Sequence, residues 1–322
     1  MKKLVLAAVL TAMFGGIHHV SAQTYPSRPV TLIVPYPAGG PTDVIARIMA
    51  EGMRASLGQP VVIDNIGGAS GSIGIGRAAR AAPDGYTINI GSLPTHVLNG
   101  AVYSLKYDLV NDFEPVGMLP TQPMLVVTKK TLPVNSLQEF VAWLKANPDK
   151  ATQGTSGVGA VSHIVGVLFQ RETGTRFRAI PYRGSSMNDL VSGQLDLMID
   201  LASSSLPQVR AGNIKAHAVT SKTRLAVAPE IPTVDEAGLP GFHVSHWHAL
   251  FVPKDTPNEI VVKLNAATAD ALANPTVRQR MIDLGQEIPP AEQMTPQAMA
   301  AFHKAEIAKW WPVVKAANIK VD

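Results

Sequence analysis

The segment that joins the first buried strand to the first long helix reads Pro35-Tyr36-Pro37-Ala38-Gly39-Gly40-Pro41-Thr42-Asp43. The two glycines let backbone N–H groups approach a ligand, and Pro41 fits the first helical position, where no N–H is needed. Because the N–H groups and dipole of a helix start favour anions, we expect Tyr36, Ala38, Gly39 and Gly40 to hold a carboxylate or phosphate. A plain strand–turn–helix joint is the alternative.

Short apolar runs alternate with helical patterns on both sides of this segment. Residues 30–34, 61–63 and 86–90 predict strands, and 44–57 and 73–81 predict helices between them. A second series of the same kind runs from 124 to 219 and precedes an irregular stretch rich in Pro and Gly. This rhythm predicts mainly parallel sheets with helices on both faces.

The pattern at the end of the chain indicates how the sequence is distributed between the predicted lobes. After a strand at 249–252 the sequence holds helical patterns alone, which have no sheet of their own to cover. We therefore expect an α/β fold with two lobes joined by two crossings. One lobe consists of residues 23–122 together with 246–322, and the other consists of residues 123–245. Ligands of such folds bind at strand C-terminal ends that face the cleft.

Composition narrows the class of protein. The 322 residues suit about two domains. A charged share of 16% argues against a disordered chain or one that coats nucleic acid. The absence of Cys excludes disulfides, Cys-ligated metals and thiol nucleophiles. The Gly-rich segment 66–76 lacks the Lys of a phosphate-binding loop, so no nucleotide cofactor is expected.

The N-terminus has the pattern of a secretory signal peptide over residues 1–22. Lys2 and Lys3 precede an apolar run from 4 to 14, and Val20-Ser21-Ala22 offers small residues for cleavage near Ala22. Cleavage would remove two Lys and change the formal charge from 28 − 24 = +4 to 26 − 24 = +2. We expect an exported protein; a retained N-terminal anchor is the alternative.

A second strand-to-helix loop, 155–163, repeats the arrangement of the first. Ser156, Gly157 and Gly159 stand between a strand end and a helix start, so two anion-binding helix ends could face each other across the cleft. His163 falls in the first helical turn, where we expect a capping or packing role.

Five polar side chains at other strand ends are further ligand candidates. Ser92, Thr95 and His96 follow the third strand and could donate to a carboxylate, although a capped helix start is nearly as good an explanation. Arg183 offers a planar fork that suits a carboxylate, and Asp200 could bind an ammonium or hydroxyl group. A solvated Arg and a helix-capping Asp are the alternatives.

His243, His246 and His248 raise the alternative of an exported metal-dependent hydrolase. His246 and His248 would share a strand face, but the cluster holds no acid and matches no familiar zinc spacing. We therefore expect no metal and no catalytic residue here, and packing at the lobe crossing is the preferred interpretation.

Several motifs together resemble the Bug family, the extracytoplasmic solute receptors of tripartite tricarboxylate transporters. They are Tyr-Pro-Ala-Gly-Gly-Pro-Thr-Asp-x-x-Ala-Arg at 36–47, Gln-Pro-Val-Val-Ile-Asp-Asn at 59–65, Pro-Asp-Gly-Tyr-Thr at 83–87, Pro-Tyr-Arg-Gly at 181–184 and Ile-Pro-Thr-Val-x-Glu at 231–236. The resemblance covers nearly all of the mature chain. One departure is Pro41, where the family usually has a third Gly, which removes one possible N–H donor.

The resemblance implies a type II periplasmic binding protein rather than an enzyme. In that family the loops matching 36–42 and 155–160 form opposite walls of the site and hold a carboxylate through backbone groups and water. We accordingly expect a monomer in the periplasm that closes on a small organic carboxylate and delivers it to membrane permease subunits. No cofactor and no nucleic-acid partner are expected.

Overall fold

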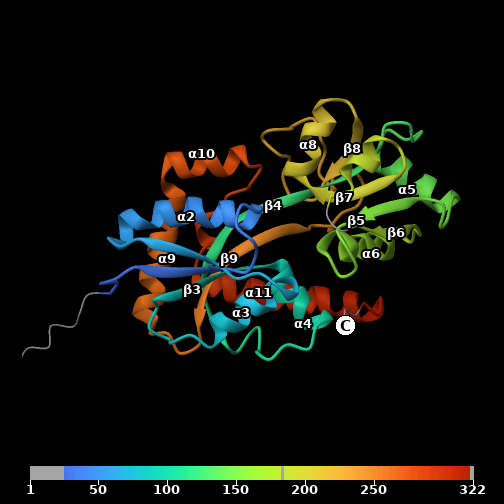
Figure 1. Cartoon of the computed structure of the whole chain (residues 1–322). Helices are drawn as coiled ribbons and strands as arrows, with labels where there is room; N and C mark the ends of the chain where they lie inside the picture. The colour runs from blue at the N-terminus through green and yellow to red at the C-terminus, as the bar shows by residue number, and fades with distance from the viewer. Residues whose placement is uncertain (1–24, 183–184, 320–322) are drawn as a thin grey trace, which may run out of the picture.

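A mixed sheet of nine strands organises the described part of the chain, residues 25–182 and 185–319, in the computed structural model of Figure 1. The strands are β1 (Val30–Val34), β2 (Val61–Asn65), β3 (Thr87–Ser92), β4 (Phe113–Lys129), β5 (Thr152–Thr155), β6 (Arg178–Pro181), β7 (Leu197–Leu201), β8 (Ile214–Val219) and β9 (Ser245–Pro253). The sheet order is β2-β1-β3-β9-β4-β7-β5-β6, with β8 paired to β4. The predicted α/β class is confirmed.

Helices cover both faces of this sheet. They are α2 (Pro41–Leu57), α3 (Ser72–Ala79), α4 (Asn99–Val102), α5 (Leu137–Ala146), α6 (Val161–Thr173), α7 (Met187–Val191), α8 (Ala202–Arg210), α9 (Asn258–Ala273), α10 (Pro275–Asp283) and α11 (Pro296–Ala316). Short non-α turns lie at η1 (Ala69–Gly71), η2 (Pro94–Leu98) and η3 (Ala291–Gln293). Among the described residues, no helix is both long enough and apolar enough to cross a membrane.

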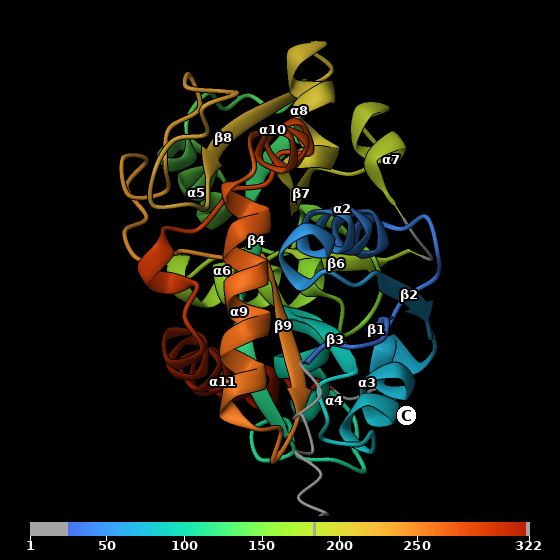
Figure 2. The same cartoon turned by 90° about the vertical axis from the view of Figure 1, so that its left-hand side faces the viewer.

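The first half of the sheet holds the parallel strands β1, β2 and β3. Side chains alternate along β1, so Leu32 packs in the core under α2 while Ile33 packs with α3 on the opposite face. Helix α9 lies against α2, so close that a Cβ on Gly52 would lie 2.8 Å from the Cβ of Ala271. Figure 2 shows α9 beside α2 in front of the sheet.

The second half holds β5, β6 and β7, which are parallel to one another. Val126 and Phe169 belong to the core under α5 and α6, whereas Leu125 and Leu206 belong to the core under α7 and α8. The tail helix α11 buries Val313 and Val314 in the same core as Phe169 and contacts α6. The tail therefore contacts both halves of the sheet.

The long strands β4 and β9 connect the two halves and pair antiparallel. The first part of β4 pairs with β9, and from Met124 onward β4 pairs with β7 and β8. At the change of partners, Gln122 pairs with His246 and Pro123 pairs with Ser245. The boundaries expected from the sequence, 122/123 and 245/246, thus fall on neighbouring, paired positions.

Strand directions decide where the functional loops lie. Both β3 and β4 run antiparallel to β9, so β1 and β3 point along β4 toward the second half. Strands β5 and β7 run opposite to β4 and point back toward the first half. The C-terminal ends of both sets therefore point at each other over the middle of β4, where ligands of such sheets bind. We call loops 35–43, 92–96, 155–163 and 200–203 the junction.

Strand β4 is longer than the sequence predicts. The sequence predicts a strand that begins at Met124, because Thr121-Gln122-Pro123 interrupts the pattern just before it. In the structure the strand begins at Phe113, and its register with β9 shifts between 115 and 117 and between 118 and 121. Prolines are tolerated at such irregular positions of a ladder. The sequence predicts mainly parallel sheets. The observed sheet is mixed, because β8 and β9 pair antiparallel with β4.

The packing of the tail on the first half can be tested with two substitutions on α9. Leu264→Ala removes a side chain that is 0% exposed and should lower the free energy of unfolding by about 2–5 kcal/mol. Val262→Ala on the same helix, where 54% of the residue is exposed, should change it by less than about 0.5 kcal/mol. Urea denaturation measures both, and equal effects would contradict the packing.

Candidate ligand-binding site

The loop before α2 presents backbone N–H groups at the junction. Gly39 has a φ of 81°, a left-handed conformation that favours glycine, and Gly40 is the helix N-cap without a side-chain cap. Pro41 occupies the first turn. Among the described residues, no acceptor lies within hydrogen-bond reach of the N–H groups of Thr42 and Asp43. These donors can therefore serve an anion from outside the chain.

Asp43 holds this loop in shape. Its carboxylate accepts hydrogen bonds from the Gly39 N–H at 2.8 Å, from Arg47 Nε at 2.8 Å and from Asn65 Nδ2 at 2.9 Å. Burial raises the pKa of the Asp43 carboxyl, but these hydrogen bonds outweigh it and lower the pKa to about 2. Asp43 is therefore ionised and fixes the loop.

The loop before α6 has the same character. Gly157 and Gly159 have φ values of 126° and 76°, and the N-cap Ala160 offers no side-chain acceptor. His163 Nδ1 accepts a hydrogen bond from the Gly159 N–H at 3.1 Å, and burial lowers the pKa of this imidazole. His163 thus has the structural role expected of it. Ser162 Oγ accepts from the Ser156 N–H at 3.0 Å, which folds the loop back.

Three helices away from the junction begin with a side-chain cap, whereas α3, α4, α7 and α9 begin without one. Ser136 caps α5, Asn274 caps α10 and Thr295 caps α11, each through a side-chain oxygen that accepts backbone N–H groups. At the junction α2, α6 and α8 all begin without a side-chain cap. Because orphan N–H groups at a helix start need an acceptor, the uncapped starts are suited to an anionic ligand.

Polar side chains gather beneath the start of α2. Ser92 of β3 pairs with His248 of β9, and Tyr36 Oη lies 3.4 Å from Ser92 Oγ. Thr42 Oγ1 lies 3.2 Å from His248 Nε2, and the His248 ring stacks on His246 with centroids 4.9 Å apart. Burial lowers the pKa of both imidazoles, that of His246 to about 4. Both rings are therefore neutral at pH 7.

Thr95 and His96 are both fully buried, but in different surroundings. Thr95 Oγ1 accepts a hydrogen bond from the Ser92 N–H at 3.0 Å and lies 3.2 Å from Ser92 Oγ, so it stays beside these polar groups. His96 stacks on Phe251 with centroids 4.2 Å apart, on the side of the sheet that packs against α11. The chain turns into η2 directly after Ser92, and this turn directs His96 into the core. The expectation that His96 contacts a ligand does not agree with its position here.

The remaining candidates differ in their surroundings. Ala38 and Ser156 are exposed at the junction, Gly157 and Gly159 are half-buried, and Arg183 lies outside the described residues. Asp200 stands near the end of β7 opposite Leu125, and burial raises the pKa of its carboxyl. A carboxyl group in this state can be held partly protonated and can then donate a hydrogen bond.

The three histidines do not converge on a metal site. His243 precedes β9, and its Nε2 lies 2.8 Å from Asp235 Oδ2. His246 and His248 face the side of the sheet that carries α2. Among the described residues no three His, Cys, Asp or Glu side chains form a group that could hold a metal ion. The hydrolase alternative therefore loses the constellation on which it depended.

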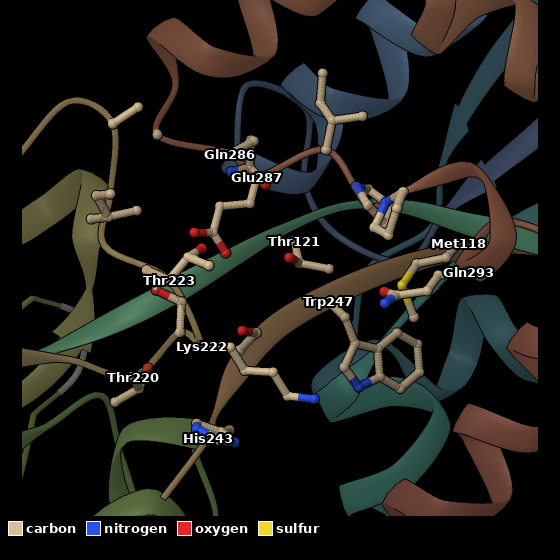
Figure 3. A pocket seen from close by; sticks show the side chains of 18 of the residues that line it. Met118, Thr121, Thr220, Lys222, Thr223, His243, Trp247, Gln286, Glu287 and Gln293 are labelled. Atoms are coloured by element: carbon tan, nitrogen blue, oxygen red, sulfur yellow. Dashed lines mark hydrogen bonds between the residues drawn. The ribbon is translucent and has the colours of Figure 1, made fainter. Parts of the chain in front are cut away.

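A cavity of about 790 Å³ lies on the other face of β4 and β9 (Figure 3). Trp247 alternates with His246 and His248 along β9 and so points to this face, together with its cross-strand partner Thr121. Residues 220–227 form one wall, and residues 285–293 form another, tied to β4 by backbone hydrogen bonds between Thr121 and Glu287. We call this space the rear cavity.

Sequence reasoning did not identify Thr42, Ser162 or His248 as residues of the junction. Thr42 was part of the quoted loop, but a β-branched residue after Pro41 gave no signal beyond helix initiation. For His248 the sequence favours packing at the lobe crossing, with a metal site as the alternative, and does not indicate a place beside the ligand. Its alternation with Trp247 was the signal that placed the two side chains on opposite faces of a strand.

The chain matches the model of one protein family, described as the tripartite tricarboxylate transporter family receptor, over residues 45–319. A protein from Agrobacterium vitis, described by its position in the TAR-I ttuE-ttuC' intergenic region, is 40% identical over 97% of this chain and 91% of its own length. The protein BugT of Bordetella pertussis is 36% identical over 99% of this chain and 98% of its own length.

Several solved structures also match this chain over most of its length. The periplasmic binding protein BugD matches with a TM-score of 0.75 at 38% identity, covering 92% of this chain and all of that one. MatC of Rhodopseudomonas palustris, solved with malate, matches with 0.75 at 39% identity over 90% of this chain and all of its own. Rpa4515 of R. palustris, solved with adipate, matches with 0.77 at 36% identity over 92% of this chain and all of its own. None of these descriptions supports a hydrolase.

The role of Asp43 can be tested through pH. Its pKa is lowered from about 3.9 in unfolded chains to about 2, so its stabilising effect is full above pH 4 and is lost as the pH falls through 2. We expect Asp43→Asn to lower the free energy of unfolding clearly at pH 7 and much less at pH 2.5. Urea titrations at both pH values measure this difference. Glu51→Gln, in an exposed ion pair with Arg280, is the control and should change little at either pH.

Proposed function

This chain belongs to the tripartite tricarboxylate transporter receptor family, and on that premise we propose that it captures a small organic carboxylate between the starts of α2 and α6. The members of this family and the structural neighbours are solute-binding receptors rather than enzymes, and this protein is a solute-binding receptor as well. The proposal concerns the residues that bind, the movement that follows and the partners.

The observation that carries the proposal is the pair of uncapped helix starts on opposite sides of the junction. Each offers N–H groups without an acceptor among the described residues, and each follows a strand whose end points at the other half of the sheet. Hydrogen bonds to a charged acceptor are about twice as strong as neutral ones, so a carboxylate is the group these donors favour. Tyr36, Gly39, Gly40 and Ser92 would contact it from one side, and Ser156, Gly157 and Gly159 from the other.

A dicarboxylate can engage both helix starts at once. MatC is described with bound malate and Rpa4515 with bound adipate, and these ligands differ in length between their carboxyl groups. We infer that the ligand of this chain is a small dicarboxylate with one carboxyl group at each helix start. Asp200 would contact a hydroxyl or protonated group between them, and Arg183 would assist at the second carboxylate.

The two lobes would close on this ligand. One lobe consists of residues 23–122 together with 246–322, and the other consists of residues 123–245. The bend would lie where β4 exchanges β9 for β7 and β8, at the pairs of Gln122 with His246 and Pro123 with Ser245. Closure is then stabilised only when one ligand bonds to both helix starts, which makes ligand binding and closure two parts of one equilibrium.

The partners and location follow from the same family. We propose that residues 1–22 are removed near Ala22, that the mature monomer works in the periplasm and that the closed form delivers its ligand to the permease subunits of a tripartite transporter. The signal peptide lies outside the described residues. Mass spectrometry of the protein purified from the periplasmic fraction would locate the mature N-terminus, and a protein that begins at Met1 would contradict this point.

The site can be tested by adding caps to the two helix starts. Ala160→Asp and Gly40→Asp place a capping carboxylate where α6 and α2 have none. Ala160→Asp should stabilise the unliganded protein by about 0.5–2 kcal/mol, because the new side chain satisfies the orphan N–H groups. Gly40→Asp should stabilise it by only about a few tenths of a kcal/mol, because glycine is itself a fair N-cap residue. The same side chain occupies the ligand's position, so the affinity for malate or adipate should fall at least about tenfold. Thermal unfolding and calorimetric titration measure the two effects.

Asn274→Asp at the capped start of α10 is the control, since it adds the same charge away from the junction. It should leave the affinity unchanged. Unaltered affinity in both cap variants would contradict the proposed site. The receptor function would still stand in that case if the wild-type protein bound malate or adipate. The function itself fails if a broad panel of mono-, di- and tricarboxylates leaves the melting temperature of the wild-type protein unchanged.

A further inference from the structure

The rear cavity is separate from the junction. Its lining residues include none of loops 35–43, 92–96, 155–163 or 200–203. Trp247 points into it, whereas its neighbours His246 and His248 lie on the opposite face of β9. Its volume of about 790 Å³ falls within the range of about 300–1,000 Å³ that is typical of small-molecule sites. A molecule held there would therefore not compete for the same space as a ligand at the junction.

One side of the rear cavity is apolar and partly aromatic. Phe302 of α11 meets Trp247 edge to face, with ring centroids 5.6 Å apart. Met118 of β4, Leu225 and Ile288 extend this surface. The Trp247 ring is fixed, because its Nε1 donates to Glu306 Oε2 at 3.0 Å. A rigid apolar wall of this kind suits a ring or a short hydrocarbon body.

The other side carries cations, and Arg224 is the one among them that has a carboxylate partner within 4.0 Å in the described part of the chain. Arg224 is bonded to Glu236, and Lys309 Nζ donates to the His243 carbonyl at 2.6 Å. In contrast, no carboxylate lies within 4.0 Å of Lys222 or Arg278 among the described residues; the Arg278 Nη1 reaches only the Leu272 carbonyl. Figure 3 shows the Lys222 side chain extending toward Trp247, across the space.

The carboxylates that face this space do not offset the two cations. Glu306 accepts hydrogen bonds from the indole N–H groups of both Trp247 and Trp310, each at 3.0 Å. Burial raises the pKa of the Glu287 carboxyl. Four Lys and Arg side chains line the rear cavity, against these two carboxylates. Two unpaired cations opposite an apolar wall therefore favour a ligand with one anionic end.

We propose that the rear cavity is a second ligand site, which takes an amphipathic organic carboxylate with an aromatic or aliphatic body. Its carboxylate is held by Lys222 and Arg278, and its body lies on Trp247 and Phe302. The walls belong to both of the lobes proposed above, 220–227 to one and 278–309 to the other. Occupation of this site is therefore coupled to the angle between the lobes, and such coupling is reciprocal with binding at the junction.

The test uses 3-(4-hydroxyphenyl)propionate as the probe and the full mature protein. Calorimetric titration should show binding to the wild-type protein, and to Ala160→Asp, in which the junction is blocked. Lys222→Met removes the charge and Ala298→Phe fills the space from α11. Each should raise the dissociation constant of the probe at least about tenfold. The matched controls are Lys145→Met, in the last turn of α5, and Ala305→Phe, at an exposed position of α11 outside the lining, and both should bind like wild type.

Three results would overturn the proposal: no binding of the probe to the wild-type protein at millimolar concentration, loss of probe binding in Ala160→Asp but not in Ala298→Phe, or equal weakening in variants and controls. Lys222 is exposed, so Lys222→Met remains informative even if Ala298→Phe does not fold. None of these results bears on the proposed function, which is tested with malate and adipate on the wild-type protein.

Discussion

The antiparallel pairing of β4 with β9 is the constraint on which the geometry of the site depends. Because these two strands run side by side through the middle of the molecule, the parallel strands of each half are fixed in direction relative to them. The ends of β1 and β3 and the ends of β5 and β7 therefore face each other, and the helix starts that follow them do so as well. The same two strands separate the junction from the rear cavity, since successive side chains on β9 point to opposite faces.

Most of the fold could be predicted from the sequence, because buried parallel strands are continuous apolar runs. Val30–Val34, which pairs in parallel with β2 and β3, was placed at its observed bounds for this reason. The first part of β4 could not be predicted, because its prolines break the pattern and are accommodated only by the register shifts against β9. Helix α10 buries only Val277 and Met281, so its sequence carries too weak an apolar periodicity to be found.

The candidate site was predictable where backbone chemistry decides it and less so where side-chain direction does. Gly39, Gly40, Gly157 and Gly159 signal loops that expose N–H groups, and the structure has helix starts without side-chain caps after both loops. His96 was expected to face the ligand because it follows a strand end. The turn into η2 and the ring of Phe251 direct it into the core instead, and neither effect can be read from local sequence.

The proposed grip made from peptide N–H groups would have an evolutionary consequence. Any residue except proline supplies the same N–H donor, so most substitutions around the two loops alter the shape and polarity of the space without removing the grip. New solutes can then be accommodated by single changes in side chains, and the affinity for the common carboxyl group is inherited. Relatives that are 39% and 36% identical to this chain and were solved with malate and adipate accord with such divergence. Pro41 marks the limit of this tolerance, because it is the one residue of the first loop's helix start that has no donor to give.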